Sequence, residues 1–297
     1  MKNIVRKSVC LICNKTKFIK TEFHPRDSEK HLIVQCLYCQ HFQIEPIPNE
    51  NELKNFYDHN QQSKMIEKKI NLNLLKQRRM SDTKRRLNFV IKHTKKNGRI
   101  LEIGSGYGLF LNELKKYGFL ATGIEISKLR RKISQKFTDA EILDVNLLKT
   151  TPKMNKFDTI VMFQVLEHIN EPTVFLKNLK KLLKKSGKLI IEVPNISDFQ
   201  ITSNIFYNKW FWQLAHINYF SPSSLKTANK KSGFKNIQIK GVQRYSIKNM
   251  FYWNLFGKPE LKTPSYDFPT YDWLDKVYKN TLEKKLISDT IISIAEK

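Results

Sequence analysis

The 297-residue chain lacks any apolar run of the roughly 20 residues that a membrane-spanning helix needs. Its N-terminal stretch MKNIVRKSVC also lacks the apolar segment of a secretory signal. Acidic residues are scarce, with 27 Asp and Glu against 53 Lys and Arg, so the formal net charge is +26. Because 40% of the residues are hydrophobic, we expect a globular cytoplasmic protein without a membrane span.

The excess of positive charge suits nucleic acid, an anionic membrane surface or a phosphorylated small substrate. Lysines are spread along the whole chain and greatly outnumber arginines, although arginine is the better residue for bidentate phosphate contacts. This distribution favours a general bias towards lysine over a dedicated nucleic-acid surface. Nucleic acid is therefore disfavoured as a partner, and a phosphorylated or nucleotide-linked small molecule remains compatible with the charge.

Cysteine is nearly absent, and all four cysteines fall in the first 40 residues: Cys10, Cys13, Cys36 and Cys39. Two Cys-x-x-Cys pairs separated by 22 residues can place four thiolates around one zinc ion. A disulfide is disfavoured in a reducing cytosol. A redox dithiol needs one such pair beside a βαβ pattern, which is missing here. Four thiolates close the coordination sphere, so we expect structural zinc, with the nearby His41 at the surface.

The chain divides into three predicted parts. Residues 1–48 are predicted to form a zinc ribbon of short strands, which ends in the proline-rich turn Ile44–Pro48. Residues 49–97 are predicted to be a helical linker or cap, with helices over Asn51–Tyr57 and within Ser63–His93. A basic face on the second helix is expected to be solvated, and it comprises Arg78, Arg79, Lys84, Arg85 and Arg86.

Residues 98–297 alternate between apolar strands and amphipathic helices, as in a parallel sheet with helices on both faces. The predicted strands are Arg99–Ile103, Leu120–Ile126, Ile142–Leu143, Phe157–Phe163, Lys188–Val193, Phe234–Val242 and Asp289–Ala295, the last at the sheet edge. The predicted helices are Leu109–Tyr117, Ser127–Phe137, Glu171–Lys185 and Ser221–Ser232. The chain between Pro194 and Phe220 looks irregular, and residues 243–285 look like an insertion.

Glycine is uncommon too, yet three of the ten glycines fall in one turn between a strand and a helix: Gly104, Gly106 and Gly108. Glycine lets the backbone turn sharply and approach a ligand closely. A dinucleotide site has the spacing Gly-x-Gly-x-x-Gly, whereas this turn has Gly-x-Gly-x-Gly. The tighter spacing favours a ligand whose nucleoside and amino-acid ends straddle the loop.

Two acids follow at the ends of the next two predicted strands. Glu125 lies 21 residues after Gly104 and can accept both hydroxyls of a ribose. Asp144 can accept from the amino group of an adenine, although aspartates in turns are common without a ligand. The glycine turn and both acids lie in order at consecutive strand ends, so together they indicate a nucleoside site at the switch point of the sheet.

These segments resemble the class I S-adenosylmethionine-dependent methyltransferases. The resemblance is carried by ILEIGSGYG at 100–108, GIEIS at 123–127, FDTIVMFQVLEHINEP at 157–172 and KSGKLIIEVPN at 185–195. The resemblance is strongest for the branch of ubiquinone-type O-methyltransferases and deoxysugar methyltransferases. The N-terminal zinc ribbon and the segment HINYFS at 216–221 also resemble segments found in this branch. It implies an α/β, Rossmann-like fold of seven strands that ends in an antiparallel hairpin.

The resemblance also implies a site for S-adenosylmethionine. The acid and glycines of the first turn would hold the methionine part, Glu125 the ribose, and Asp144 with Val145 the adenine. Phe163 and Gln164 would line the methyl-donor end. The full set of expected cofactor contacts is Glu102, Gly104, Ser105, Gly106, Glu125, Ile126, Asp144, Val145, Phe163 and Gln164.

Methyl transfer displaces a good leaving group, so positioning supplies much of the catalysis and the acceptor needs at most a base. Two histidines are candidate catalytic residues. His168 follows the fourth strand of the parallel sheet, and His216 lies in an aromatic stretch that would form the substrate wall. The alternative for His168 is a loop-fixing hydrogen bond.

The resemblance favours a sugar nucleotide or a surface-glycan precursor as acceptor, methylated on oxygen or carbon. The alternative is an RNA methyltransferase that binds ribosomal RNA through the ribbon. Against it, the segment Phe163–His168 lacks the Asn/Asp-Pro-Pro-aromatic turn used for base amino groups. The sequence leaves monomer and homodimer open, and the aromatic segment Asn249–Pro259 is either a lid or an interface.

Overall fold

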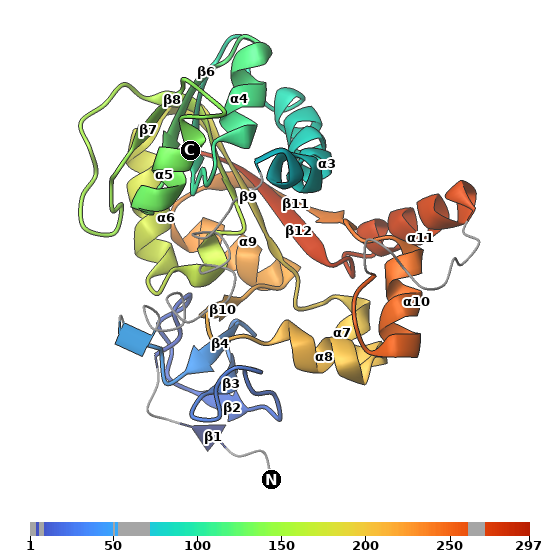
Figure 1. Ribbon diagram of the computed structural model, residues 1–297. Helices are drawn as coiled ribbons and strands as arrows, with labels where there is room; N and C mark the ends of the chain where they lie inside the picture. The colour runs from blue at the N-terminus through green and yellow to red at the C-terminus, as the bar shows by residue number, and fades with distance from the viewer. Residues whose placement is uncertain (1–3, 6–8, 50, 53–71, 261–270) are drawn as a thin grey trace.

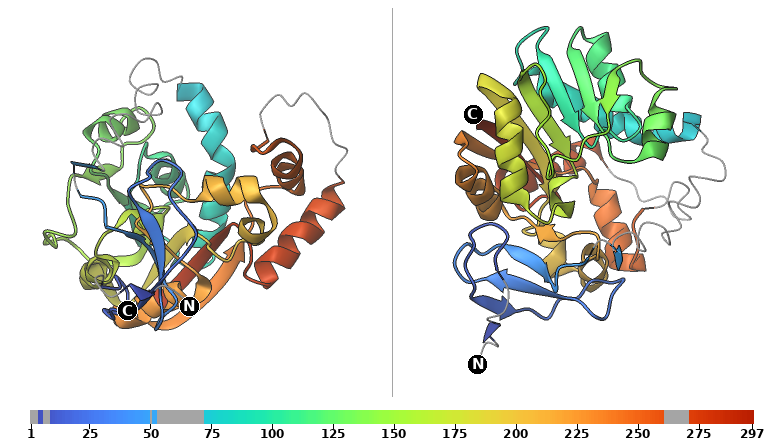
Figure 2. Two further views of the ribbon diagram at one scale, coloured as in Figure 1. Left: turned by 90° about the horizontal axis from the view of Figure 1, so that it is seen from below. Right: turned by 90° about the vertical axis from the view of Figure 1, so that its left-hand side faces the viewer.

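A computed structural model describes residues 4–5, 9–49, 51–52, 72–260 and 271–297. These residues form two sheets, a small one in the order β1-β2-β3-β4-β10 and a large one in the order β11-β12-β9-β8-β5-β6-β7 (Figure 1). The small sheet lies at one end of the large one, as the side view in Figure 2 shows. The expected Rossmann-like fold of seven strands with an N-terminal cysteine-bearing unit is confirmed.

The small sheet contains four strands from the N-terminal segment and one from far along the chain. Its bounds are β1 Ile4–Val5, β2 Phe18–Lys20, β3 Leu32–Cys36, β4 Phe42–Glu45 and β10 Asn218–Tyr219. All described neighbours pair antiparallel, and β10 pairs with the outer edge of β4. The N-terminal unit, which we call the ribbon, therefore shares a sheet with the rest of the protein.

The large sheet contains the strands β5 Arg99–Ile103, β6 Leu120–Ile124, β7 Glu141–Leu143, β8 Phe157–Phe163, β9 Leu183–Pro194, β11 Lys235–Val242 and β12 Thr290–Glu296. Strands β5 to β9 are parallel, whereas β12 is antiparallel to both β9 and β11. The expected final hairpin is thus present. The predicted edge position of Asp289–Ala295 is wrong, because β12 inserts between β9 and β11. Its nearly continuous burial suits an inner strand, and the exposed lysines of β11 suit an edge.

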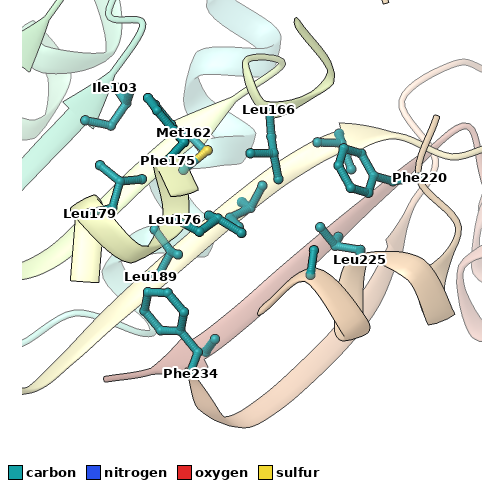
Figure 3. Packing of buried hydrophobic residues seen from close by; sticks show 14 of the residues in the cluster. Ile103, Met162, Leu166, Phe175, Leu176, Leu179, Leu189, Phe220, Leu225 and Phe234 are labelled. Atoms are coloured by element: carbon teal, nitrogen blue, oxygen red, sulfur yellow. The ribbon is translucent and has the colours of Figure 1, made fainter. Parts of the chain in front are cut away.

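Helices cover both faces of the large sheet, and the strand residues alternate between them. On one face, Met162 and Leu189 pack against α6 Pro172–Leu182 and α9 Pro222–Lys231 (Figure 3). On the other face, Val161 and Ile190 pack against α3 Leu72–Ile91 and α4 Leu109–Lys116. The helix α5 Lys128–Ser134 begins after Ser127, whose hydroxyl accepts from the Arg130 amide as a predicted N-cap does. No helix in the described ranges is long and apolar enough to cross a membrane.

Two predicted boundaries in the second half of the chain are wrong. The helix predicted to reach Lys185 ends at Leu182, because Leu183 is fully buried and pairs with Phe157 as the start of β9. The stretch between Pro194 and Phe220 is not irregular. It forms α7 Phe199–Ser203 and α8 Ile205–Phe211, which Asp198 and Asn204 cap, and then β10.

The predicted insertion contains two helices, α10 Ile247–Phe256 and α11 Asp272–Lys284. The predicted helix Asn51–Tyr57 and the first part of Ser63–His93 lie largely outside the described residues. The rest of that second prediction is confirmed by α3, which ends at Ile91.

The basic face of α3 is not simply solvated, contrary to the expectation. Arg85 and Arg86 both donate to the buried carboxylate of Glu192 on β9, with nitrogen–oxygen distances of 2.5–3.0 Å. Burial alone would raise the pKa of Glu192, but the charges of Arg86 and Arg85 outweigh it and lower this pKa to about 2. The interaction anchors α3 over the carboxyl end of the sheet.

We expect the Glu192→Gln variant to lose about 3 kcal/mol of unfolding free energy, because two guanidinium groups lose their shared carboxylate. Urea denaturation at pH 7 measures the loss. The matched control Glu113→Gln removes a pair with the exposed Lys116 and should cost less than about 1 kcal/mol. Because the pKa of Glu192 is depressed, its contribution should persist above the ordinary glutamate pKa and disappear only as the pH falls towards 2. Equal losses in both variants would contradict this role.

Candidate active site

The glycine turn lies between the carboxyl ends of β5 and β6. The amides of Gly104 and Ser105 both donate to the carbonyl of Ile124, at 2.8 and 3.1 Å, and so fold the turn onto β6. Gly104 and Gly106 have φ angles of +69° and +55°, which side chains other than glycine rarely adopt. A Cβ on Gly104 would clash with Val165, so the turn also packs against the loop that follows β8.

Gly106 faces open space, since a Cβ built on it would meet no atom within 4 Å. Its amide donates to Oε2 of Glu125 at 2.9 Å, and the Ser127 amide donates to Oε1 at 2.8 Å. These two amides hold the buried Glu125 carboxylate beside the gap next to Gly106. The arrangement brings together the glycine and the acid that the sequence placed 19 residues apart, and the open space beside Gly106 leaves room for a ligand next to this pair.

Arg131 joins the ends of β6 and β7. Its guanidinium donates to the carbonyl of Glu125 and to the carboxylate of Asp144, both at 2.6 Å. The side chain of Asp144 is 63% exposed. Ile126, the apolar residue that directly follows Glu125, is 72% exposed. Val145 is half-buried against the main core. An exposed apolar side chain after β6 and an anchored acid after the neighbouring β7 could border an adenine ring.

Three buried polar atoms near these strand ends have no hydrogen-bond partner among the described residues: Oε2 of Glu102, Oγ of Ser105 and Nε2 of Gln164. Such groups are rare in proteins unless a ligand or water completes them. Burial raises the pKa of Glu102 well above its ordinary value, with only partial compensation by Arg86. The set offers an acid, a hydroxyl and an amide to a polar ligand, which fits the amino-acid end of the expected cofactor.

Phe163 and Gln164 differ in what they can offer a ligand. The ring of Phe163 packs edge-on against Phe110 at 5.0 Å and lies under Arg86 at 4.7 Å, so it belongs to the core beneath α3. Gln164 adopts a φ of +58°, and its backbone amide donates to the carbonyl of Glu192. The strand therefore ends in a sharp turn that frees the side chain of Gln164 rather than the ring of Phe163.

The two candidate histidines lie together, although 48 positions separate them in the sequence. Their rings are 5.0 Å apart and nearly perpendicular. Nδ1 of His168, on the short helix η1 Leu166–His168, donates to the Ala215 carbonyl at 2.7 Å, which leaves the lone pair on Nε2. Burial lowers the pKa of both imidazoles, and that of His216 falls well below its ordinary value. Both rings are therefore neutral at pH 7, as a base requires.

Glu167 completes this cluster, although the sequence alone did not predict it as a site residue. Its carboxylate is 4.0 Å from Nε2 of His168, and both of its oxygens lack a partner in the described structure. Burial raises the pKa of Glu167 to about 8. Candidate ligand atoms of Glu167, His168 and His216 lie within 4.8 Å of one another and are of the types that bind divalent metals. The only feature of the sequence that could have indicated Glu167 was its position directly before His168.

The four cysteines converge at the ends of the ribbon strands. The Sγ atoms of Cys10 and Cys39 are 3.5 Å apart, as are those of Cys13 and Cys36, and all four lie within 4.8 Å of one another. Tetrahedral zinc with bonds of about 2.3 Å places sulfurs about 3.8 Å apart, so the cluster fits this ion. His41 is not at the surface as expected. It is fully buried, and its Nε2 lies 3.0 Å from Oδ1 of Asn218 on β10.

Comparison with known proteins agrees with this geometry. The sequence profile of the methyltransferase-domain family matches residues 74–239. The ubiquinone biosynthesis O-methyltransferases of Coxiella burnetii and Pelagibacter ubique are 25% and 27% identical to this chain over 169 and 168 residues. These matches cover 53% and 52% of this chain and 72% and 68% of the relatives.

Among solved structures, a SAM-dependent methyltransferase from Archaeoglobus fulgidus superposes with a TM-score of 0.53 at 19% sequence identity. It covers 76% of this chain and 100% of its own, which supports the same fold. The family profile spans more than half of the chain, including the glycine turn, Glu125 and the loop after β8. The chain therefore belongs to the methyltransferase-domain family and is an S-adenosylmethionine-dependent methyltransferase.

Proposed function

We propose that this enzyme, in the cytoplasm, methylates an oxygen or carbon of a small acceptor that is phosphorylated or linked to a nucleotide, as in a sugar nucleotide or a surface-glycan precursor. The observation that carries the proposal is the pair of neutral imidazoles beyond β8. A neutral imidazole can take up the proton that a hydroxyl or an acidic carbon loses when it is methylated. The charge of +26 attracts the phosphates of such an acceptor.

Methyl transfer to ribosomal RNA that is bound by the ribbon is the second candidate. Here the outer edge of β4 is occupied by β10, and the buried His41 contacts Asn218 instead of solvent. The ribbon thus faces its own protein on this side, which favours the small-molecule acceptor.

S-adenosylmethionine supplies an electrophilic methyl carbon on a good leaving group. In the proposed complex the turn at Gly104–Gly106 and the orphan atoms of Glu102 and Gln164 bind its amino-acid end. Glu125 accepts from the ribose, and the exposed Ile126 with Asp144 and Val145 borders the adenine. Ser105 adds a buried hydroxyl to the same wall.

His168 and His216 act on the acceptor in this proposal. The hydrogen bond to Ala215 leaves Nε2 of His168 as a proton acceptor. The side-chain amide nitrogen of Gln213 lies 3.0–3.2 Å from the ring nitrogens of His216. The ring of Tyr219 lies 5.9 Å from that of His216 and 4.8 Å from that of Trp212, so aromatic rings wall this region. In the ribbon, Cys10, Cys13, Cys36 and Cys39 hold structural zinc.

The Gly106→Val variant should bind S-adenosylhomocysteine at least about 100-fold more weakly, because the new side chain fills the gap beside Glu125. Isothermal titration calorimetry measures the affinity. The matched control is Gly118→Val, which imposes a similar backbone strain at φ +81° in a turn after α4, away from the gap. Tight binding by the Gly106 variant would show that the cofactor lies elsewhere.

The His216→Ala variant should lower kcat by about 100-fold while the affinity for S-adenosylhomocysteine changes little, since a positioned base contributes about this much. Because the pKa of each imidazole is lowered by burial, the wild-type rate should fall as the pH drops below the ordinary histidine pKa. Equal losses of turnover and cofactor affinity would instead indicate a structural role.

The acceptor class is tested with radiolabelled S-adenosylmethionine and two sets of probes, nucleoside diphosphate hexoses and total ribosomal RNA. We expect label transfer to at least one nucleotide-linked hexose, with a rate that falls as salt screens the attraction. Transfer to RNA alone, with a steep salt dependence of RNA binding, would replace the proposal by the second candidate.

A further inference from the structure

We propose that the ribbon positions the two active-site histidines, and that Asn218 is the positioning residue through which it does so. The inference rests on the proposed function only in assigning His168 and His216 to the acceptor. The strand β10 follows β4 by more than 170 residues, yet it forms the outer strand of the ribbon sheet. In Figure 1, β10 lies between the ribbon strands and the large sheet.

Asn218 uses both ends of its buried side-chain amide, one on each side of this junction. Its Oδ1 accepts from Nε2 of His41 in the ribbon at 3.0 Å. Its Nδ2 donates to the carbonyl of Ile169 at 2.6 Å, directly after the helix η1 that ends at His168. One side chain therefore connects the ribbon to the loop that carries an active-site histidine.

Each Cys-x-x-Cys pair, which we call a knuckle, is connected to Asn218 through one intervening residue, His41 or Gln43. In the second knuckle, the carbonyl of His41 accepts from the amide of Cys36 at 2.9 Å. In the first, Oε1 of the buried Gln43 accepts from the Leu11 amide at 3.0 Å, and its Nε2 donates to the carbonyl of Val9 at 3.2 Å. These two residues flank Cys10, and Gln43 is also the register partner of Asn218. A closed zinc site would hold both routes in place.

The other side of β10 determines where the imidazoles lie. The Ile217 amide donates to the Glu167 carbonyl at 2.9 Å, and the Ile217 carbonyl accepts from Ile44 in β4 at 3.0 Å. His168 in turn donates to the carbonyl of Ala215 at 2.7 Å. The segment that follows His216 is thus bonded to η1 on one side and to the ribbon on the other, so the spacing of the two rings depends on β10.

A merely structural role for Asn218 would lower stability without a specific effect on the histidines, so the test needs a matched buried asparagine. Asn229 on α9 is fully buried and also makes two side-chain hydrogen bonds, donating to the Leu225 carbonyl and to Ser293, but it lies on the face of the sheet packed by α9. The Asn218→Ala and Asn229→Ala variants lose comparable hydrogen bonds. Only the first loses a contact with the loop of His168.

The experiment compares both variants with wild type as full-length, zinc-loaded proteins bound to S-adenosylhomocysteine. We expect each variant to retain one zinc per chain and an affinity for S-adenosylhomocysteine within about threefold of wild type. The imidazole ¹⁵N signals of His168 and His216 should shift or broaden in Asn218→Ala and stay unchanged in Asn229→Ala. With the nucleotide-linked hexose as acceptor, kcat should fall about tenfold or more in Asn218→Ala alone, since small displacements of reacting groups are costly.

Unchanged imidazole signals in Asn218→Ala, or equal changes in both variants, would overturn the proposal. If Asn218→Ala fails to fold, His41 provides the second pair of variants. His41→Gln keeps a donor for Oδ1 of Asn218 and should keep wild-type signals, whereas His41→Leu should reproduce the shifts. Shifts in both His41 variants would also overturn it. Altered imidazole signals together with no methylation of any nucleotide-linked probe would refute the proposed acceptor and leave the positioning role intact.

Discussion

The structure depends on one short segment, residues 217–220, whose buried backbone must be satisfied by three different parts of the chain. Ile217 bonds to β4 on the ribbon side and to η1 on the other. Phe220 forms an isolated parallel bridge with Asn195, and its carbonyl accepts from the amide of Ile196 at 2.9 Å. The segment therefore fixes the ribbon, the loop after β8 and the loop after β9 relative to one another.

Side-chain burial reinforces the same junction from two cores. Phe220 is fully buried in the main core with Leu225 and Val193, whereas Tyr219, its neighbour, points into a second core with Trp212 and Ile44 of the ribbon. Across this second core the ring of Phe23 stacks on Trp212 at 4.5 Å. Large aromatic rings contribute much buried apolar area, so this contact opposes separation of the ribbon from the enzyme. Any shift of the ribbon would have to repack both cores.

Features that depend on neighbours in sequence were predictable, and those that depend on distant partners were not. The strands β5 and β8 have the predicted bounds, because apolar runs flanked by turn residues are local signals. The basic face of α3 was misjudged because Glu192, its partner, lies 106 residues or more away. The position of His41 was misjudged for the same reason, since its hydrogen-bond partner Asn218 lies 177 residues away.

The same distinction between local and distant partners applies to the residues of the candidate site. The spacing of the glycine turn and Glu125 reflects one strand–turn–helix–strand unit, so their contact followed from local order. Phe163 stays a predicted contact of the methyl-donor end, whereas its packing in the core beneath α3 and the positive φ of Gln164 after it follow from no propensity. Glu167 was passed over because an acid beside a histidine has no distinctive pattern until the fold buries it.

Burial of unpaired polar groups explains why folding and ligand binding should be linked in this enzyme. Glu102, Ser105, Gln164 and Glu167 all bury polar atoms without a partner in the described structure, and all follow or end the parallel strands β5 and β8. Each such group costs about 1–3 kcal/mol unless a ligand or water completes it. A ligand that satisfies them stabilises the folded state by its binding free energy. The carboxyl edge of the sheet should thus gain stability when a ligand binds, while the hydrogen bond from Ile217 to Glu167 holds η1 in place without one.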